Sequence, residues 1–143
     1  ALSASSPARD TTEVIVNERI RHAIESDSMI ALFGMEVEET SEGLARVSAE
    51  VKKEFLQLHD LAHGGFIFAL LDVAFALTVN AEVDAVAVQW SVSQFRPTKL
   101  GDRVVAECRL LHGGRRLMVV ELIATTAAGK MLAKGQATAI PVG

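Results

Sequence analysis

The chain contains 143 residues, of which 50% are hydrophobic and 22% are charged, and its formal net charge at pH 7 is −4. This length and apolar content predict one domain with a substantial core and exclude intrinsic disorder for most of the chain. Because the charge balance is mildly acidic and no basic run occurs, we expect no nucleic-acid partner.

The N-terminal residues and the single cysteine give the only indications of processing and of cellular location. Residues 1–10 are rich in serine and lack the apolar core of a signal peptide, so we expect a flexible tail there and a single domain over residues 11–143. The one cysteine, Cys108, permits no internal disulfide, and its alternating neighbours favour a small buried hydrophobe over a catalytic thiol. A reducing, cytoplasmic location is the expectation that follows.

The domain begins with a predicted amphipathic helix over residues 12–32. Asp10 and Glu13 have the spacing of a capping box, and Gly34 is placed to end the helix. Apolar residues inside this range recur at helical spacing. They are Val16, Ile20, Ala23 and Ile24.

Two strands are expected next, over residues 35–39 and 44–53, on either side of a turn at residues 40–43. In the second strand small apolar residues alternate with polar ones, as in a strand with one buried face. They are Ala45, Val47, Ala49 and Val51. Residues 54–62 are expected to form a loop that leads into an apolar helix.

The most apolar stretch, residues 61–79, contains one acidic residue, Asp72. Its length approaches that of a membrane span. The central acid, the glycines at its start and the absence of flanking positive charge favour instead a buried core helix that ends near Asn80, and we expect no membrane partner. A buried ionised carboxylate is very costly without partners, so we expect Asp72 to be compensated or functional.

The remainder of the chain is predicted to form four strands separated by turn and hairpin signals. They cover residues 85–95, 103–111, 117–126 and 131–140. This order of elements predicts an α+β fold in which a curled antiparallel sheet wraps around the long central helix. A doubly wound α/β fold fits less well, because no helices alternate with the later strands.

The central helix starts at His63, Gly64 and Gly65. A helix start exposes unpaired backbone N–H groups and the positive end of the helix dipole, which together stabilise an anion. At 1.5 Å and 100° per residue, His63 and Asp72 lie about 14 Å apart on nearly opposite faces, and Gly64 lies about 12 Å from Asp72. If both groups serve one site, the partner group comes from a second copy of the chain, which predicts an obligate dimer with shared sites.

Residues 63–76 read HGGFIFALLDVAFA, and with the strands that follow they resemble the hotdog-fold thioesterases of the PaaI-like, phenylacetate-degradation type. Residues 95–97, 101–102 and 113–116 add to a match that extends over residues 32–140. The resemblance implies a hotdog fold and hydrolysis of acyl-CoA thioesters at sites shared across a homodimer. It also implies a dimer of dimers in many members, hence a homotetramer, and no metal or redox cofactor.

Two positions depart from known patterns. Gln57 stands where the PaaI-like proteins usually have Asn, whereas a related hotdog group that acts on 4-hydroxybenzoyl-CoA has Gln there and pairs it with Glu on the helix. Ala76 stands where that second group has Thr. The thioesterase interpretation accommodates both differences, and they leave the acyl group, aryl or aliphatic, open.

The resemblance assigns catalytic roles to four residues. The backbone N–H of Gly64 would hold the thioester oxygen, and Asp72 would act as general base on water or as nucleophile. His63 would orient the helix start, and Gln57 would hydrogen-bond the attacking water or the carbonyl. The structural alternatives are close packing at the glycine, a paired or capping acid, a helix-cap histidine and an exposed loop amide.

Seven further residues are candidates for substrate binding: Gly65, Ala76, Trp90, Ser93, Arg96, Arg115 and Arg116. Arginines at strand ends and turns suit the phosphates of coenzyme A, with solubilising surface charge as the alternative. Trp90 suits the lining of an acyl pocket, with core packing as the alternative.

Other functions stay open at this point. A hotdog hydratase acting on acyl thioesters carries a different histidine motif, so the start of this helix argues against it. A non-catalytic hotdog module that binds acyl-CoA would not require both Gly64 and Asp72. A metal site at His59, Asp60 and His63 is a weaker interpretation, because the ligands would lie on a loop.

Overall fold

The structure is a computed structural model that describes residues 17–143. The predicted tail and the capping pair Asp10 and Glu13 lie outside these residues. Along the described chain the elements are two helices, two strands, a short 3-10 helix (η1, Lys53–Phe55), a long helix and four strands. The order predicted from sequence is therefore confirmed, with a short helical turn where the predicted second strand and the predicted loop meet.

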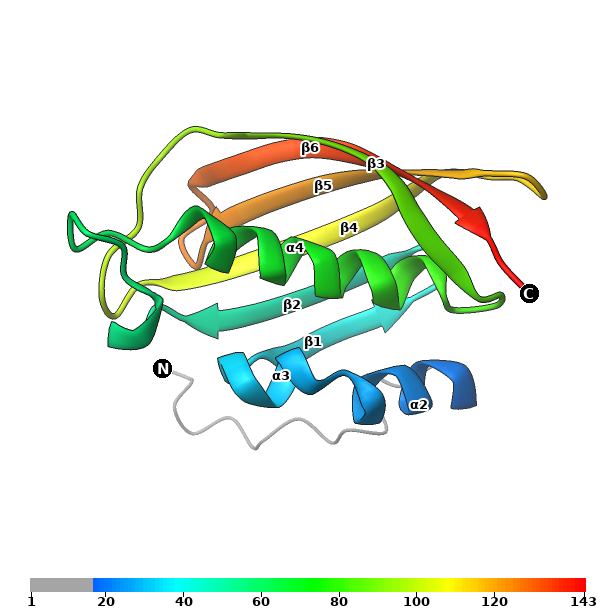
Figure 1. Ribbon diagram of the computed structural model, residues 1–143, viewed down its shortest axis with the longest axis horizontal. Coiled ribbons are helices and arrows are strands. Elements are labelled where there is room, and N and C mark those ends of the chain that lie inside the picture. Colours follow the sequence, from blue (N-terminus) through cyan, green and yellow to red (C-terminus); the bar gives the residue numbers. More distant parts are fainter. Residues whose placement is uncertain (1–16) are drawn as a thin grey trace.

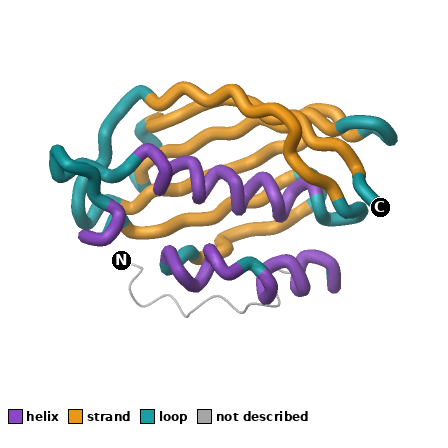
Figure 2. The backbone as a smooth tube through the Cα atoms, viewed as in Figure 1, coloured by secondary structure: helices purple, strands orange, loops and turns teal. Residues whose placement is uncertain are grey.

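One antiparallel sheet of six strands forms the body of the molecule and curls around helix α4 (Gly64–Val79), as Figure 1 and Figure 2 show. Its order is β1-β2-β4-β5-β6-β3, so β3 lies at one edge although it precedes β4 in the chain. The strands are β1 (Glu36–Ser41), β2 (Leu44–Glu50), β3 (Ala85–Gln94), β4 (Arg103–Gly113), β5 (Met118–Thr126) and β6 (Met131–Pro141). This arrangement confirms the α+β hotdog architecture.

The first predicted helix is divided in two. Helix α2 (Glu18–Ser26) begins after Asn17, whose side chain accepts a hydrogen bond from the Ile20 N–H, and helix α3 (Ser28–Phe33) begins after Asp27. Asp27 has an extended backbone and accepts a hydrogen bond from the Met29 N–H at 3.0 Å. A short acid can replace the missing helical partner of an N–H group, so it starts a new helix instead of continuing the old one. Gly34 ends α3 in the left-handed conformation (φ 64°), as expected.

The core lies between the concave face of the sheet and α4. The alternating residues predicted to face inward in and after β2 are all 0% exposed: Ala45, Val47, Ala49 and Val51. Cys108 is also fully buried, and burial raises the pKa of its thiol to about 12, so it acts as a small hydrophobe, as expected. No helix within residues 17–143 has the length and apolar character needed to cross a membrane.

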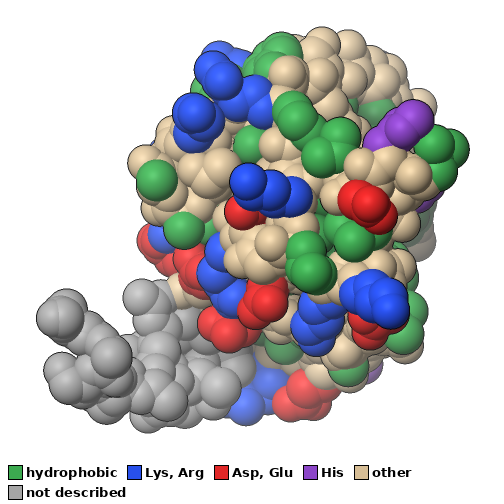
Figure 3. Space-filling view, turned by 90° about the vertical axis from the view of Figure 1, so that its left-hand side faces the viewer, with side chains coloured by type: hydrophobic (Ala, Val, Ile, Leu, Met, Phe, Trp, Pro, Cys, Tyr) green, Lys and Arg blue, Asp and Glu red, His purple; other side chains and the backbone are tan. Residues whose placement is uncertain are grey.

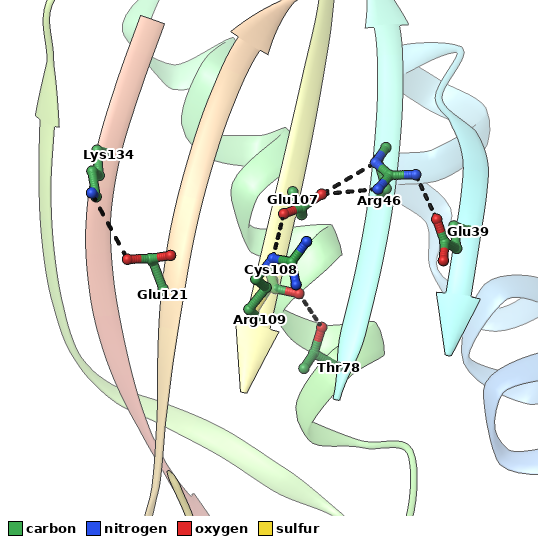
Figure 4. Close-up of polar contacts among 8 residues, drawn as sticks. All are labelled: Glu39, Arg46, Thr78, Glu107, Cys108, Arg109, Glu121 and Lys134. Atoms are coloured by element: carbon green, nitrogen blue, oxygen red, sulfur yellow. Dashed lines mark hydrogen bonds and ion pairs between the residues drawn. The ribbon is translucent and has the colours of Figure 1, made fainter. Parts of the chain in front are cut away.

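The opposite face of the sheet is polar. Arg46 lies between two carboxylates, with N–O distances of 2.6 Å to Glu39 and 3.0 Å to Glu107, and Glu107 also pairs with Arg109 at 2.8 Å (Figure 4). These residues alternate along their strands with core residues such as Cys108, so the same period of two that builds the core also builds this ion-pair network. The ion pairs therefore lie on the outer face of the sheet, and α4 lies on the inner face.

Candidate active site along the uncovered stripe of α4

Helix α4 has one side that the other elements within residues 17–143 leave largely uncovered. Eleven of its 16 residues are buried, and those that are not buried are Gly64, Gly65, Phe68, Asp72 and Ala76. Spacing of four residues places Gly64, Phe68, Asp72 and Ala76 along one oblique line on the helix surface. We call this line the uncovered stripe.

The exposure of Asp72 corrects the expectation of a buried carboxylate and of a helix covered on all sides. In the single chain Asp72 is exposed to solvent. The sequence pattern was misleading because Phe68 and Ala76, which flank Asp72 on the stripe, are apolar although they too are only half-buried. The apolar surroundings still desolvate the carboxylate in part and raise the pKa of Asp72, and the nearby charge of Asp27 raises it further.

The stripe begins at the N-terminal end of α4. His63 is the N-cap, and its Nδ1 accepts a hydrogen bond from the Gly65 N–H at 3.2 Å, so the neutral ring carries its proton on Nε2. Within residues 17–143 no group accepts a hydrogen bond from the Gly64 N–H. Gly64 is also exposed. The first helical N–H is therefore available to an anion or a polarised carbonyl, at the positive end of the dipole.

Two loops hold this helix start in place. The His63 N–H donates to the Phe55 carbonyl at 2.7 Å, and the Ala62 N–H donates to the Thr98 carbonyl at 2.7 Å. The rings of Phe33, Phe55 and Phe66 form one cluster, with centroid distances of 5.0 Å from Phe55 to Phe33 and 4.8 Å from Phe55 to Phe66. A donor fixed from several sides needs little reorganisation when a substrate arrives.

Gln57 lies in the first of these loops but is not bonded to the helix start. Its side-chain oxygen accepts a hydrogen bond from the His59 N–H, inside a turn in which Asp60 has a positive φ of 62°. The carbonyl side of this amide is thus occupied in the single chain, and its NH₂ group is the part that could meet a substrate. Within residues 17–143 no group of three or more His, Cys, Asp or Glu side chains is arranged to hold a metal ion.

The substrate-binding candidates divide into near and distant residues. Ala76 belongs to the stripe, and Gly65 is exposed next to its first residue. Trp90 lies beside the stripe, with its ring centroid 4.8 Å from those of Phe68 and Phe75. Because side chains alternate along β3, Trp90 faces α4 and Ser93 faces the opposite side of the sheet. Within one chain Ser93 is therefore separated from Gly64 by the sheet.

The arginine candidates lie at opposite ends of the molecule. Arg96 is in the loop that follows β3, next to the start of α4. Arg115 and Arg116 are in the turn between β4 and β5, beside the other end of the helix. A helix of 16 residues spans about 24 Å, so the second pair cannot meet a ligand at the Gly64 N–H of the same chain unless that ligand is long.

Figure 3 shows the end of the molecule where α4 begins. Acidic and basic side chains are interspersed on this face, with hydrophobic side chains exposed between them. Three exposed apolar residues come from the two loops that hold the helix start: Leu58, Phe95 and Leu100. This end of the molecule therefore offers apolar contact surface and charges of both signs.

One residue of the site was not expected from the sequence. Gln94, the last residue of β3, donates a hydrogen bond from Nε2 to the Gly64 carbonyl at 3.3 Å. The available signal was the period of two along β3, which places Gln94 on the same side of the sheet as Trp90. Only the packing of β3 against the helix start shows which glycine it meets.

A curled antiparallel sheet around a helix with a free first N–H group and a carboxylate on its uncovered side defines a hotdog-fold hydrolase. The chain matches the Thioesterase superfamily over residues 59–133, a range that includes all of α4. It is 32% identical over 103 residues to the acyl-coenzyme A thioesterase PaaI of Escherichia coli strain K12, covering 71% of this chain and 74% of that protein. The chain belongs to the thioesterase superfamily and is a thioester hydrolase of the PaaI-like type, which confirms the resemblance seen in the sequence.

Two solved structures share the fold. The PaaI protein of the phenylacetic acid degradation operon of E. coli has a TM-score of 0.85 at 27% identity, with 88% of this chain and 92% of that chain covered. A hypothetical thioesterase from Streptococcus pneumoniae TIGR4, solved with coenzyme A, has a TM-score of 0.78 at 26% identity, with 87% and 97% covered.

Proposed function

We propose that this protein hydrolyses acyl-CoA thioesters to a free acid and coenzyme A, at sites that two copies of the chain build together. The observation that carries this proposal is the pair Gly64 and Asp72 on one uncovered stripe, about 12 Å apart along the helix. A thioester carbonyl at the Gly64 N–H lies too far from Asp72 of the same chain for a direct attack. A second copy with its α4 antiparallel to the first brings the Asp72 of one chain to the Gly64 of the other.

The second copy has a surface to bind. Strand β3 ends the sheet, and among the described strands it pairs with β6 alone. Val86 and Val88 on this strand are 48% and 55% exposed. A long exposed edge strand favours pairing with another strand, and β3 adjoins the uncovered stripe through Trp90 and Phe68. These features support a homodimer, or a dimer of dimers, in which the stripe is covered.

The proposed chemistry uses the helix start and the acid together. The Gly64 N–H and the helix dipole stabilise the negative charge that develops on the thioester oxygen. Asp72 of the other copy takes a proton from water, the water oxygen attacks the carbonyl carbon, and the C–S bond breaks as the thiolate of coenzyme A leaves and takes up the proton. A raised pKa brings this carboxylate closer to the operating pH, where a general base is most effective. Direct attack by Asp72 to form a mixed anhydride is the alternative. His63 keeps its proposed orienting role, and Gln57 its proposed hydrogen bond to the attacking water or the carbonyl.

The proposed substrate contacts follow from the same arrangement. Trp90, Gly65 and Ala76 line the acyl path beside the stripe, and Arg96 meets the coenzyme phosphates at the helix start. Arg115 and Arg116 would contact a phosphate bound at the Gly64 of the partner copy, and not at the Gly64 of their own chain. Ser93 would contact only a ligand on the outer face of the sheet. The reaction involves no net electron transfer, so it calls for no redox cofactor, and a thioester is sufficiently activated to react without a metal. A cytoplasmic location agrees with a coenzyme A substrate.

The experiment that tests the proposal is release of free thiol from a panel of aryl and aliphatic acyl-CoAs by the purified protein. Turnover that depends on Asp72 supports the hydrolase. Tight binding of acyl-CoA with no thiol released by any member of the panel would instead establish a non-catalytic acyl-CoA-binding module.

A further inference from the structure

The Gln94 side chain lies flat against Gly64. Besides the 3.3 Å hydrogen bond from Nε2 to the Gly64 carbonyl, its amide group lies close to the position that a Cβ atom at residue 64 would take. A Cβ atom built on Gly64 would lie 3.3 Å from Nε2, 3.5 Å from Oε1 and 3.7 Å from Cδ of Gln94. At Gly65 the nearest atom belongs to His63, at 3.4 Å, so Gln94 restricts only the first glycine.

The strand that carries Gln94 is held by β6 along one edge and by α4 against its inner face. Gln94 pairs with Ala133 of β6, and the next residue, Phe95, donates its N–H to the Leu132 carbonyl at 2.7 Å. On the side of α4, Trp90 contacts Phe68 and Phe75. The Gln94 amide is therefore presented to Gly64 from a rigid element rather than from a loop.

We infer that Gln94 is a positioning residue that fixes the peptide joining Gly64 to Gly65 and, through the Gly64 Cα, aims the free Gly64 N–H on the adjoining peptide. This inference rests on the proposed role of that N–H in holding the thioester oxygen. Glycine has no Cβ and leaves the first turn of the helix conformationally free. A hydrogen bond to the Gly64 carbonyl, together with contact over its Cα, removes that freedom and preorganises the donor.

Two substitutions and a matched control test the inference. Gln94→Met keeps the length of the side chain and removes the hydrogen bond, and Gln94→Glu presents an acceptor both to the Gly64 carbonyl and to the developing oxyanion. Gln89→Met is the control, because Gln89 lies on the same strand but faces the outer side of the sheet. We expect Gln94→Met to lower kcat about 3–10-fold, the effect of one neutral hydrogen bond, with KM nearly unchanged. Gln94→Glu should lose more, and Gln89→Met should match the wild type.

The direct contact is tested by a double-mutant cycle. Gly64→Ala should lower kcat because its Cβ presses on the Gln94 amide, and Gln94→Ala removes the atoms that it meets. The double variant should therefore lose less than the product of the two single losses. Independent losses, or equal losses in Gln94→Met and Gln89→Met, would overturn the inference.

A second readout separates this inference from the proposed function. Hydrogen–deuterium exchange at the Gly65 N–H reports on the order of the helix start without any substrate. Gln94→Met should speed exchange at this amide several-fold while Gln89→Met leaves it unchanged. If the wild type hydrolyses no thioester but this exchange pattern holds, the proposed function fails and the positioning role survives. Unchanged exchange in Gln94→Met refutes the positioning role whatever the activity.

Discussion

Gly64 and Asp72 lie on the same uncovered stripe of α4, eight residues apart, with Phe68 between them. The helix rise places them about 12 Å from each other, which is too far for one substrate carbonyl to contact both directly. The two groups face the same solvent-exposed side of the molecule beside the edge strand β3. A site that uses both is completed by a second chain.

Asp72→Asn should reduce turnover of acyl-CoA by at least about 10²-fold, because it removes the base or nucleophile and keeps the shape of the side chain. Thiol release under saturating substrate measures the loss, and size-exclusion chromatography checks that the oligomer is intact. Turnover close to that of the wild type would remove Asp72 from the mechanism.

The same substitution should stabilise the protein at neutral pH. The raised pKa of Asp72 means that the folded chain holds this proton more tightly than the unfolded chain does. The free energy of unfolding therefore falls as pH rises from the ordinary value of 3.8 through the raised pKa, and Asp72→Asn does not suffer this loss. Thermal unfolding should give a higher Tm for Asp72→Asn at pH 7 and a smaller difference near pH 4. Glu82→Gln, at an exposed acid in the loop after α4, serves as the control.

Hybrid dimers should recover activity. Gly64→Pro removes the donor N–H at the first helical position, where proline is tolerated. Protomers carrying it, mixed with Asp72→Asn protomers, would form one intact composite site per dimer. Circular dichroism must first show that Gly64→Pro folds, since its ring meets Gln94. Failure to recover activity in verified hybrids would mean that each chain builds its own site.

Replacing the arginines at either end of the molecule should affect only substrates that carry the coenzyme A nucleotide. Arg96→Ala, and the double change Arg115→Ala with Arg116→Ala, should raise KM for acyl-CoA with little change in kcat if these residues bind the coenzyme. Both effects should shrink at high salt, because exposed charges are screened within about 10 Å at 0.1 M ionic strength. An acyl-N-acetylcysteamine, which lacks the nucleotide, should be indifferent to either change. Equal losses on both substrates would place the arginines in the fold or the interface.

Gly135→Ala should destabilise the sheet where β3 meets β6. A Cβ at this position would overlap the Ser91 carbonyl oxygen and lie 2.7 Å from the Val92 Cα, both backbone atoms that cannot turn away. Overpacking of this kind costs about 1–3 kcal/mol or more. Urea denaturation measures the free energy of unfolding, with Gln136→Ala, at an exposed neighbour in β6, as control. An unchanged midpoint would show that β3 can move away from β6 without cost.

The sequence by itself determined the elements and their order. Residues 64–79 form a helix and the later segments form strands because apolar residues recur with the period of each structure, and local signals such as the histidine and glycines at positions 63–65 mark the boundaries. The motif also determined the family, because its residues are close together in the chain. The division of the first helix at Asp27 was not predicted, since a short acid can either continue a helix or cap a new one.

The tertiary structure alone decided what surrounds these elements. A helix that is apolar on every side does not reveal which side stays uncovered, so the exposure of Asp72 depended on where the sheet and α2 and α3 pack. The contact between Gln94 and Gly64, and the placement of Arg115 and Arg116 beside the far end of α4, join residues that are distant in the chain. Periodicity describes one element at a time, whereas such contacts depend on the curl of the sheet and on the register of β3, which long-range packing sets.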